Sequence, residues 1–328
     1  MRIPYKSLAA IGAVAAGTAA VNTLIGQRTG LLENRIGGRE RMYKWRYGDI
    51  FYTTSGGGEP ILFIHGIGAG ASSFEWRRNF LPLADHYNVY ALDLLGFGLS
   101  DKPPVEYNAE MYVQMIAEFI LDVIGQPSHV AASSHGAAYA VAAAVRHKPM
   151  IKSLILSCPT GIGVAETSSS IAPGLSALLR VPIIGTSVYY GLTSRSSIKS
   201  YLESKIYFDS AEVTTTVVDQ YYAAAHQPGA ERAVRAFMSG ALNIDITQEF
   251  KELTQPAALV WGKEAKLTPV EVADRFIAIN SGVRLDILPI SGQLPHVERS
   301  DAYNAVIRDV TSRPPEGATA PPHKHTSL

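Results

Sequence analysis

The chain has a single cysteine and no excess of charge of either sign. Because Cys158 is the one cysteine among 328 residues, no disulfide can form within the chain. Lys and Arg together number 29, and so do Asp and Glu. This balance supplies no basic surface for a nucleic acid, so we expect no nucleic-acid partner. His323 and His325 alone are too few for a metal site, and we predict neither a metal nor a cofactor.

An apolar run near the N-terminus, residues 8–26, has about the length that spans a bilayer. We expect residues 1–27 to be a membrane anchor; a cleaved signal peptide and an amphipathic or packed helix are the alternatives. No convincing cleavage site closes the run. More basic residues follow it than precede it, which would place the main domain in the cytoplasm, with export as the alternative. Residues 28–42 are predicted to be a linker, and the Pro-containing residues 312–328 a disordered tail.

Hydrophobic residues make up 47% of the chain, enough for a substantial core. A helix is predicted from Asn108, as its N-cap, to Gly125, as its stop. A hairpin is predicted to join residues 43–47 and 50–54 through Gly48 and Asp49. Further apolar runs predict strands at residues 60–64, 88–93, 153–158, 257–261 and 284–288.

The pattern around Ser134 is typical of a nucleophile elbow. A run of small and β-branched residues leads into Ser134, and Ala132 and Gly136 lie two positions away on either side. Small residues there allow a strand and a helix to approach across a sharp turn, which exposes the serine above the sheet. The backbone N–H of the next residue, His135, would then point toward an acyl oxyanion.

Two Gly-rich turns upstream of Ser134 complete a recognisable set. Both follow apolar strands, and the stretches read His65-Gly66-Ile67-Gly68-Ala69-Gly70 and Leu94-Leu95-Gly96-Phe97-Gly98. On these motifs, residues 43–311 resemble the α/β-hydrolase superfamily.

The resemblance implies an α/β fold with a mostly parallel central sheet flanked by helices. The core would comprise residues 43–161 and 243–311, and residues 162–242 would form a helical cap over the active site. Ser134 would be the nucleophile, and the N–H groups of Ile67 and His135 would form the oxyanion hole. His65 would brace the loop.

The other two members of the catalytic triad are missing. Ala265 stands where the family carries its acid, in Trp261-Gly262-Lys263-Glu264-Ala265. Gln293 stands where it carries its base, in Gly292-Gln293-Leu294-Pro295-His296. Because glutamine has no titratable nitrogen near neutral pH, it cannot be a general base. His296, paired with Glu264, is the candidate for a displaced base, and His135 and His226 are alternatives.

Two classes of function therefore remain open. One is a serine hydrolase of apolar esters or lipid-like substrates that uses Ser134 with a non-standard base. The other is a catalytically inactive protein of the same fold that binds an apolar ligand or a protein partner. A third reading is a cofactor-free reaction in which the oxyanion hole stabilises an alkoxide or enolate.

Overall fold

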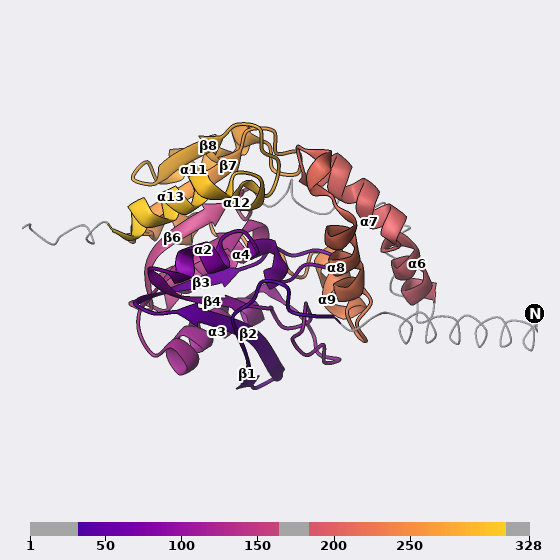
Figure 1. Ribbon diagram of the computed structural model, residues 1–328. Helices are drawn as coiled ribbons and strands as arrows, with labels where there is room; N and C mark the ends of the chain where they lie inside the picture. Colours follow the sequence, from indigo (N-terminus) through magenta and orange to yellow (C-terminus); the bar gives the residue numbers. More distant parts are fainter. Residues whose placement is uncertain (1–31, 164–183, 313–328) are drawn as a thin grey trace, which may run out of the picture.

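An eight-stranded sheet organises the molecule. The computed structural model describes residues 32–163 and 184–312. The strand order is β1-β2-β4-β3-β5-β6-β7-β8; β1 and β4 are each antiparallel to β2, and every other neighbouring pair is parallel. The predicted mostly parallel sheet is confirmed (Figure 1). The strands are β1 (Arg39–Trp45), β2 (Gly48–Gly56), β3 (Glu59–Ile64), β4 (Tyr87–Leu92), β5 (Ser128–Ser133), β6 (Ile151–Ser157), β7 (Ala257–Gly262) and β8 (Arg284–Leu288).

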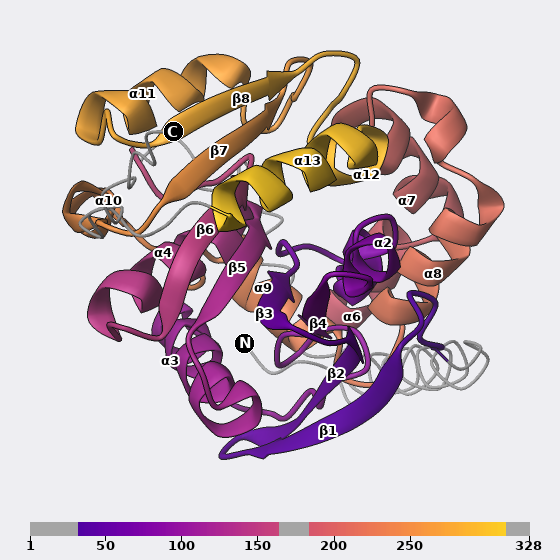
Figure 2. The same ribbon diagram turned by 60° about the vertical axis from the view of Figure 1, so that its left-hand side comes forward.

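Helices cover both faces of the sheet, as Figure 2 shows. Alternate residues of β3 point to opposite faces: Ile61 and Phe63 belong to one hydrophobic core, and Leu62 and Ile64 to the other. The core around Leu62 is shared with α3 (Ala109–Phe119), α4 (Ser134–Arg146), α10 (Thr247–Glu252) and α11 (Ala273–Ile279). The core around Phe63 is shared with η1 (Ser73–Trp76), α2 (Phe80–Ala84), α12 (Pro295–Glu298) and α13 (Ser300–Thr311).

Local signals in the sequence located the ends of several elements. The Asn108 side chain accepts the N–H of Met111 at 2.9 Å and caps α3, as predicted. After α3 the chain continues as η2 (Ile120–Ile124), and Gly125 follows in the left-handed conformation at φ 72°. The predicted hairpin exists, but its turn was misplaced: Trp45 pairs with Gly48, so Arg46 and Tyr47 form the turn.

Four of the α-helices that the structure describes between β6 and β7 gather on one side of the sheet (Figure 1). Gly70, in the loop after β3, lies against one of them, because a Cβ on Gly70 would be only 2.4 Å from the carbonyl oxygen of Tyr221. These helices are α6 (Ile184–Leu192), α7 (Arg195–Tyr201), α8 (Thr215–Ala225) and α9 (Glu231–Met238), with η4 (Leu202–Ile206) and η5 (Ser210–Glu212) between α7 and α8.

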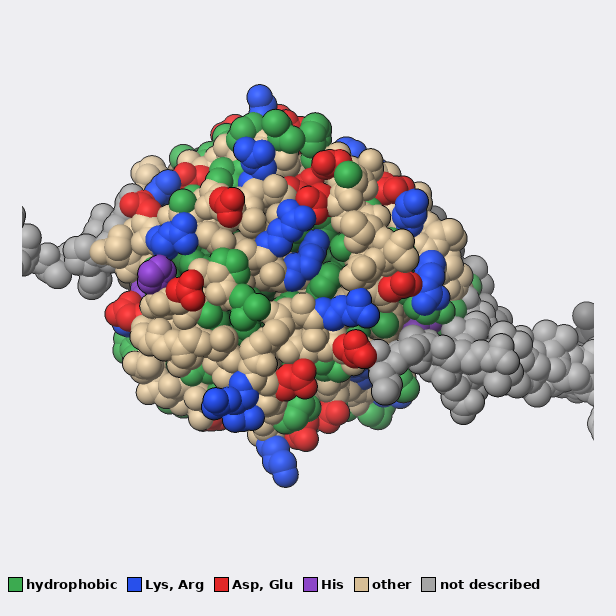
Figure 3. Space-filling model, viewed as in Figure 1, with side chains coloured by type: hydrophobic (Ala, Val, Ile, Leu, Met, Phe, Trp, Pro, Cys, Tyr) green, Lys and Arg blue, Asp and Glu red, His purple; other side chains and the backbone are tan. Residues whose placement is uncertain are grey.

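The predicted anchor at residues 1–27 and, apart from Ser312, the predicted tail at residues 312–328 lie outside the described residues. Within the described ranges, no helix is both long enough and apolar enough to cross a membrane. Acidic and basic side chains are interspersed over the face seen in Figure 3.

Candidate active site

Ser134 lies at a sharp turn between β5 and α4. Its φ of 51° is in the left-handed region that non-glycine residues rarely adopt. Gly136 is required two residues later, because a Cβ there would be 2.4 Å from the carbonyl oxygen of His65. The elbow predicted from the sequence is thus present, with helix and strand in close approach.

Strained backbone recurs around this end of the sheet. Among the described residues, the non-glycine positions with positive φ are Ser134 after β5, Cys158 after β6 and Ile290 after β8. All three lie at or beyond the carboxyl ends of parallel strands, where open α/β sheets bind their ligands. Backbone strain of this kind clusters at functional sites.

The loop after β3 faces the serine. A Cβ built on Gly66 would lie 3.3 Å from Cβ of Ser134. His65 braces this loop as predicted: its Nδ1 donates to the carbonyl oxygen of Gly66 at 2.6 Å, and its Nε2 accepts the N–H of Leu94 at 3.0 Å.

The two predicted oxyanion donors come from different segments. His135 follows Ser134 in the chain, and Ile67 belongs to the loop after β3. The N–H of His135 is in the first turn of α4, where it has no intrahelical acceptor. Within the described parts of the chain, the N–H of Ile67 donates to no protein acceptor. Two unpaired N–H groups beside a serine hydroxyl are suited to a carbonyl oxygen that gains negative charge.

The position of the missing base is filled by a hydrogen-bonded amide. Gln293 is 4% exposed, and its Nε2 donates to Oγ1 of Thr268 at 2.8 Å. Its Oε1 lies 3.3 Å from the backbone N of Thr268, from which it accepts a hydrogen bond. Ala265, at the acid position, is also buried. The loops after β7 and β8 are therefore joined by a neutral amide–hydroxyl pair.

His296, the candidate for a displaced base, is engaged elsewhere. Its Nδ1 is 2.9 Å from Oγ of Ser157, and its Nε2 is 3.1 Å from Oε1 of Glu75. Its expected partner Glu264 instead accepts the N–H of Ser291 at 3.0 Å. Because His296 and Glu264 have these other partners, the predicted pairing of the two side chains was wrong. In the described part of the chain, no imidazole is hydrogen-bonded to Oγ of Ser134.

The two other histidines considered as bases are also committed to neighbours. His135 Nε2 is 3.2 Å from Oδ1 of Asn243, and the ring packs edge-on against Phe237. His226 is stacked between Tyr190 and Tyr222, and its Nδ1 donates to the carbonyl oxygen of Tyr222 at 2.9 Å. Burial lowers the pKa of both imidazoles, which keeps them neutral.

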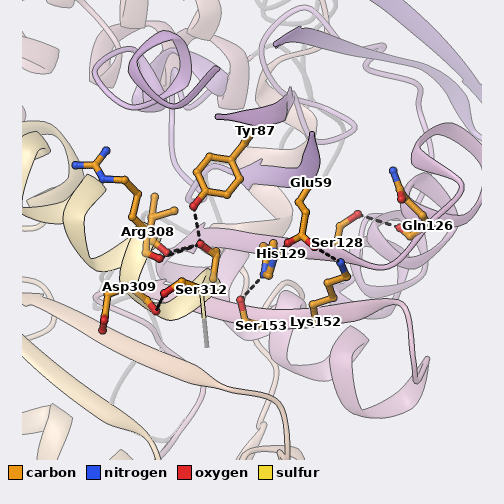
Figure 4. Close-up of polar contacts among 12 residues, drawn as sticks. Glu59, Tyr87, Gln126, Ser128, His129, Lys152, Ser153, Arg308, Asp309 and Ser312 are labelled. Carbon is orange, nitrogen blue, oxygen red and sulfur yellow. Dashed lines mark hydrogen bonds and ion pairs between the residues drawn. The ribbon is translucent and has the colours of Figure 1, made fainter. Parts of the chain in front are cut away.

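A second set of serine, histidine and glutamate lies at the opposite end of the sheet (Figure 4). His129 Nδ1 is 2.7 Å from Oγ of Ser153, and its Nε2 is 2.8 Å from Oε2 of Glu59. Lys152 also contacts Glu59, at 3.0 Å. Because Ser153 is only 2% exposed, no substrate reaches its hydroxyl, and this set is a structural network.

Neither the thiol nor the acidic groups form a further reactive centre. Burial raises the pKa of Cys158 to about 12, so the thiol stays protonated and unreactive. Within the described residues, no cluster of histidine, cysteine and carboxylate side chains could hold a metal ion.

Comparison with known proteins gives the same family as the motifs. Residues 61–306 match the model of the alpha/beta hydrolase family. The 2-hydroxy-6-oxo-6-(2'-aminophenyl)hexa-2,4-dienoic acid hydrolase of Metapseudomonas resinovorans is 27% identical, over 80% of this chain and 87% of that protein. The chain belongs to the alpha/beta hydrolase family.

Solved structures agree with this fold. A serine hydrolase involved in carbazole degradation superposes with a TM-score of 0.70 at 23% identity, covering 84% of this chain and 99% of the other. A bacterial membrane phospholipase A superposes with a TM-score of 0.67 at 23% identity, covering 94% and 98%.

Three residues of the site could not be identified from sequence. Glu75, Ser157 and Thr268 acquire their partners only when distant segments fold together. Glu75 carried one local signal: it is a charged residue between Phe74 and Trp76, in a stretch whose aromatic residues are core. Arg77 and Arg78, which follow in the sequence, would have suggested an ion pair with arginine instead of the contact with His296.

Proposed function

We propose that the protein is a hydrolase that acts at Ser134 on the carbonyl group of an apolar ester or lipid-like substrate. The observation that carries the proposal is the positive φ of Ser134, opposite the Gly-rich loop. Holding a non-glycine residue there costs about 1–3 kcal/mol, and a protein that only binds a ligand gains nothing from that strain. Several relatives are named as hydrolases, which supports the hydrolase part of the proposal.

In the proposed reaction the substrate carbonyl oxygen accepts hydrogen bonds from the N–H groups of Ile67 and His135. Oγ of Ser134 attacks the carbonyl carbon, and the bond to the leaving alkoxide breaks. The serine proton reaches that alkoxide through water, because Gln293 cannot accept it. Water then hydrolyses the acyl-enzyme. Without a triad base, the remaining acceleration over water is about 10³–10⁴-fold, so turnover is slow and favours activated esters.

The relatives suggest a second substrate to assay beside esters. Several of them are named as hydrolases of 2-hydroxy-6-oxo-dienoic acids. Turnover of 2-hydroxy-6-oxo-6-phenylhexa-2,4-dienoate and of p-nitrophenyl butyrate by the same preparation decides between the two substrate classes.

The second candidate function is binding of an apolar ligand without hydrolysis. The Gln293–Thr268 pair favours it, because both polar groups are satisfied and neither can move a proton. A binding protein needs no activated serine, so the reactivity of Ser134 separates the two functions.

Fluorophosphonate labelling, read by intact mass, tests the proposal. We expect the wild-type chain to gain one phosphonyl adduct and Ser134→Ala to gain none. Ser153→Ala is the matched control, since Ser153 is hydrogen-bonded to an imidazole but is buried; the variant should be labelled like wild type. Folded wild-type protein that resists labelling would establish the binding function instead.

A further inference from the structure

The proposed reaction leaves one buried pair of ionisable side chains, Glu75 and His296, without a role. Glu75, in η1, is 5% exposed and His296, in α12, is fully buried. Trp76 stacks on the imidazole, with ring centroids 4.2 Å apart and planes 28° apart. Burying a charged pair is costly, so its retention needs a reason beyond packing.

The Glu75 carboxylate contacts the residue before Ile67 and the residue before Ser134. Its Oε2 accepts the N–H of Gly66 at 3.2 Å, and Gly66 comes directly before Ile67. The carboxylate also accepts a hydrogen bond from the side chain of Ser133, the residue before Ser134. One carboxylate therefore holds both the loop after β3 and the end of β5, directly before Ser134.

His296 is the partner of this carboxylate. In the described ranges, it is the one basic side chain in ion-pair distance of Glu75, with Nε2 and Oε1 3.1 Å apart. Its Nδ1 lies 2.9 Å from Oγ of Ser157, at the end of β6, which fixes the ring on its other side. Burial alone would raise the pKa of Glu75, but its contacts with His296 and Ser133 outweigh burial and hold that pKa below its ordinary value. Glu75 is therefore a carboxylate, beside a site where a second negative charge must form.

We propose that Glu75 and His296 are a positioning pair for the chemistry at Ser134. Glu75 fixes the Gly66 amide and the Ser133 hydroxyl, and His296 holds the Glu75 carboxylate in place. This inference rests on the proposed function: it assigns the pair to the transition state of the same reaction. Neither residue touches the substrate.

The first test is Glu75→Gln in the full chain, which keeps the shape of the side chain and removes its charge. A charge-assisted hydrogen bond becomes a neutral one, so we expect the Gly66 amide proton to shift upfield in the ¹H–¹⁵N spectrum. We expect kcat, or the rate of fluorophosphonate labelling, to fall about 10- to 100-fold, with KM within about twofold, because the lost interaction acts in the transition state.

The charge is tested by His296→Gln, which leaves Glu75 ionised and unpaired. The loss of kcat should exceed that of Glu75→Gln, and the double variant should recover part of it, because a neutral pair replaces a lone carboxylate. Ser157→Ala removes only the hydroxyl beside Nδ1 and is the milder variant should either substitution prevent folding; it should shift the Gly66 signal in the same direction, by less.

Glu264→Gln is the matched control for the spectrum. Glu264 also accepts a backbone N–H, that of Ser291, but in the loop after β7. Its substitution should leave the Gly66 signal in place. An unchanged Gly66 signal and unchanged kcat in folded Glu75→Gln would overturn the inference. If wild-type Ser134 proves unreactive, the proposed function fails, whereas the Gly66 signal still reports whether the pair holds the loop.

Discussion

The amide of Gln293 determines what the serine can do. A histidine in its place would offer a nitrogen that exchanges a proton near neutral pH, whereas the amide only bridges to Thr268. The two loops are thus held together, but by an amide that cannot accept the serine proton. In the proposed reaction the site therefore has N–H groups for a carbonyl oxygen but no side chain that activates Ser134.

Rebuilding the two missing groups tests this description. We expect Gln293→His combined with Ala265→Asp to raise kcat for p-nitrophenyl butyrate about 10²- to 10⁴-fold, the range that a positioned general base contributes. Gln293→Ala is the control for simply breaking the bond to Thr268 and should give no gain. Steady-state kinetics on all three proteins provide the measurement. A well-folded double variant with no gain would mean that Ser134 is not aligned for attack.

Residues that depend on local chain geometry were predictable from the sequence. Ser134 and Gly136 follow from the tight turn that they form, and the missing triad groups follow from fixed spacing. His296 was predicted as a displaced base paired with Glu264, but its carboxylate neighbour in the structure is Glu75. Its contact with Glu75 joins α12 to η1, and no periodicity in either segment encodes such a long-range pairing.

At the level of elements, the loop after β3, which carries Ile67, is in direct backbone contact with α8. Gly70 has a φ of 80°, and its α-carbon faces the carbonyl oxygen of Tyr221. Helix α8 therefore rests on the loop that carries Ile67. Any side chain at position 70 must push α8 away from the site.

Gly70→Ala should therefore change substrate binding. We expect KM for an apolar ester to rise several-fold with a smaller fall in kcat, together with a lower melting temperature, because alanine is strained at this φ. Gly57→Ala is the control, since a Cβ there meets no atom within 4 Å. Kinetics and thermal unfolding of both variants decide the matter; wild-type KM in Gly70→Ala would show that α8 does not shape the site.

The elements themselves were easier to predict than their ends. The strands at residues 257–261 and 284–288 were found almost to the residue, because apolar runs bounded by turns leave few choices. The first hairpin was misplaced because Gly48 and Asp49 suggested a turn, whereas Gly48 is the first residue of β2 at φ 152°. Pairing of Gly48 with Trp45 and of Asp49 with Lys44 in β1 overrides that local preference.

Over the whole molecule, burial of histidines links stability to pH. Burial lowers the pKa of His129, although its bond to Glu59 opposes the shift. Burial likewise lowers the pKa of His135 and His226. The neutral form satisfies His129 completely: one ring nitrogen accepts from Ser153 and the other donates to Glu59 (Figure 4). A protonated ring would lose the bond in which it accepts.

The lowered pKa values of these histidines all change stability in the same direction with pH, and that change can be measured. Where the folded pKa lies below the unfolded value of about 6.5, the unfolded chain binds more protons, so stability falls as the pH drops from about 6.5 through the folded pKa values. We expect the free energy of unfolding in urea to be lower at pH 5.5 than at pH 7.5. His226→Phe, which preserves the stacking between Tyr190 and Tyr222, should reduce that difference, whereas His86→Gln at an exposed position should not. Glu298 has a raised pKa, mainly from burial, and works in the opposite direction near the acidic end, so the wild-type and variant slopes must be compared over the same interval. Equal slopes in wild type and His226→Phe would show that His226 does not contribute to the acid sensitivity.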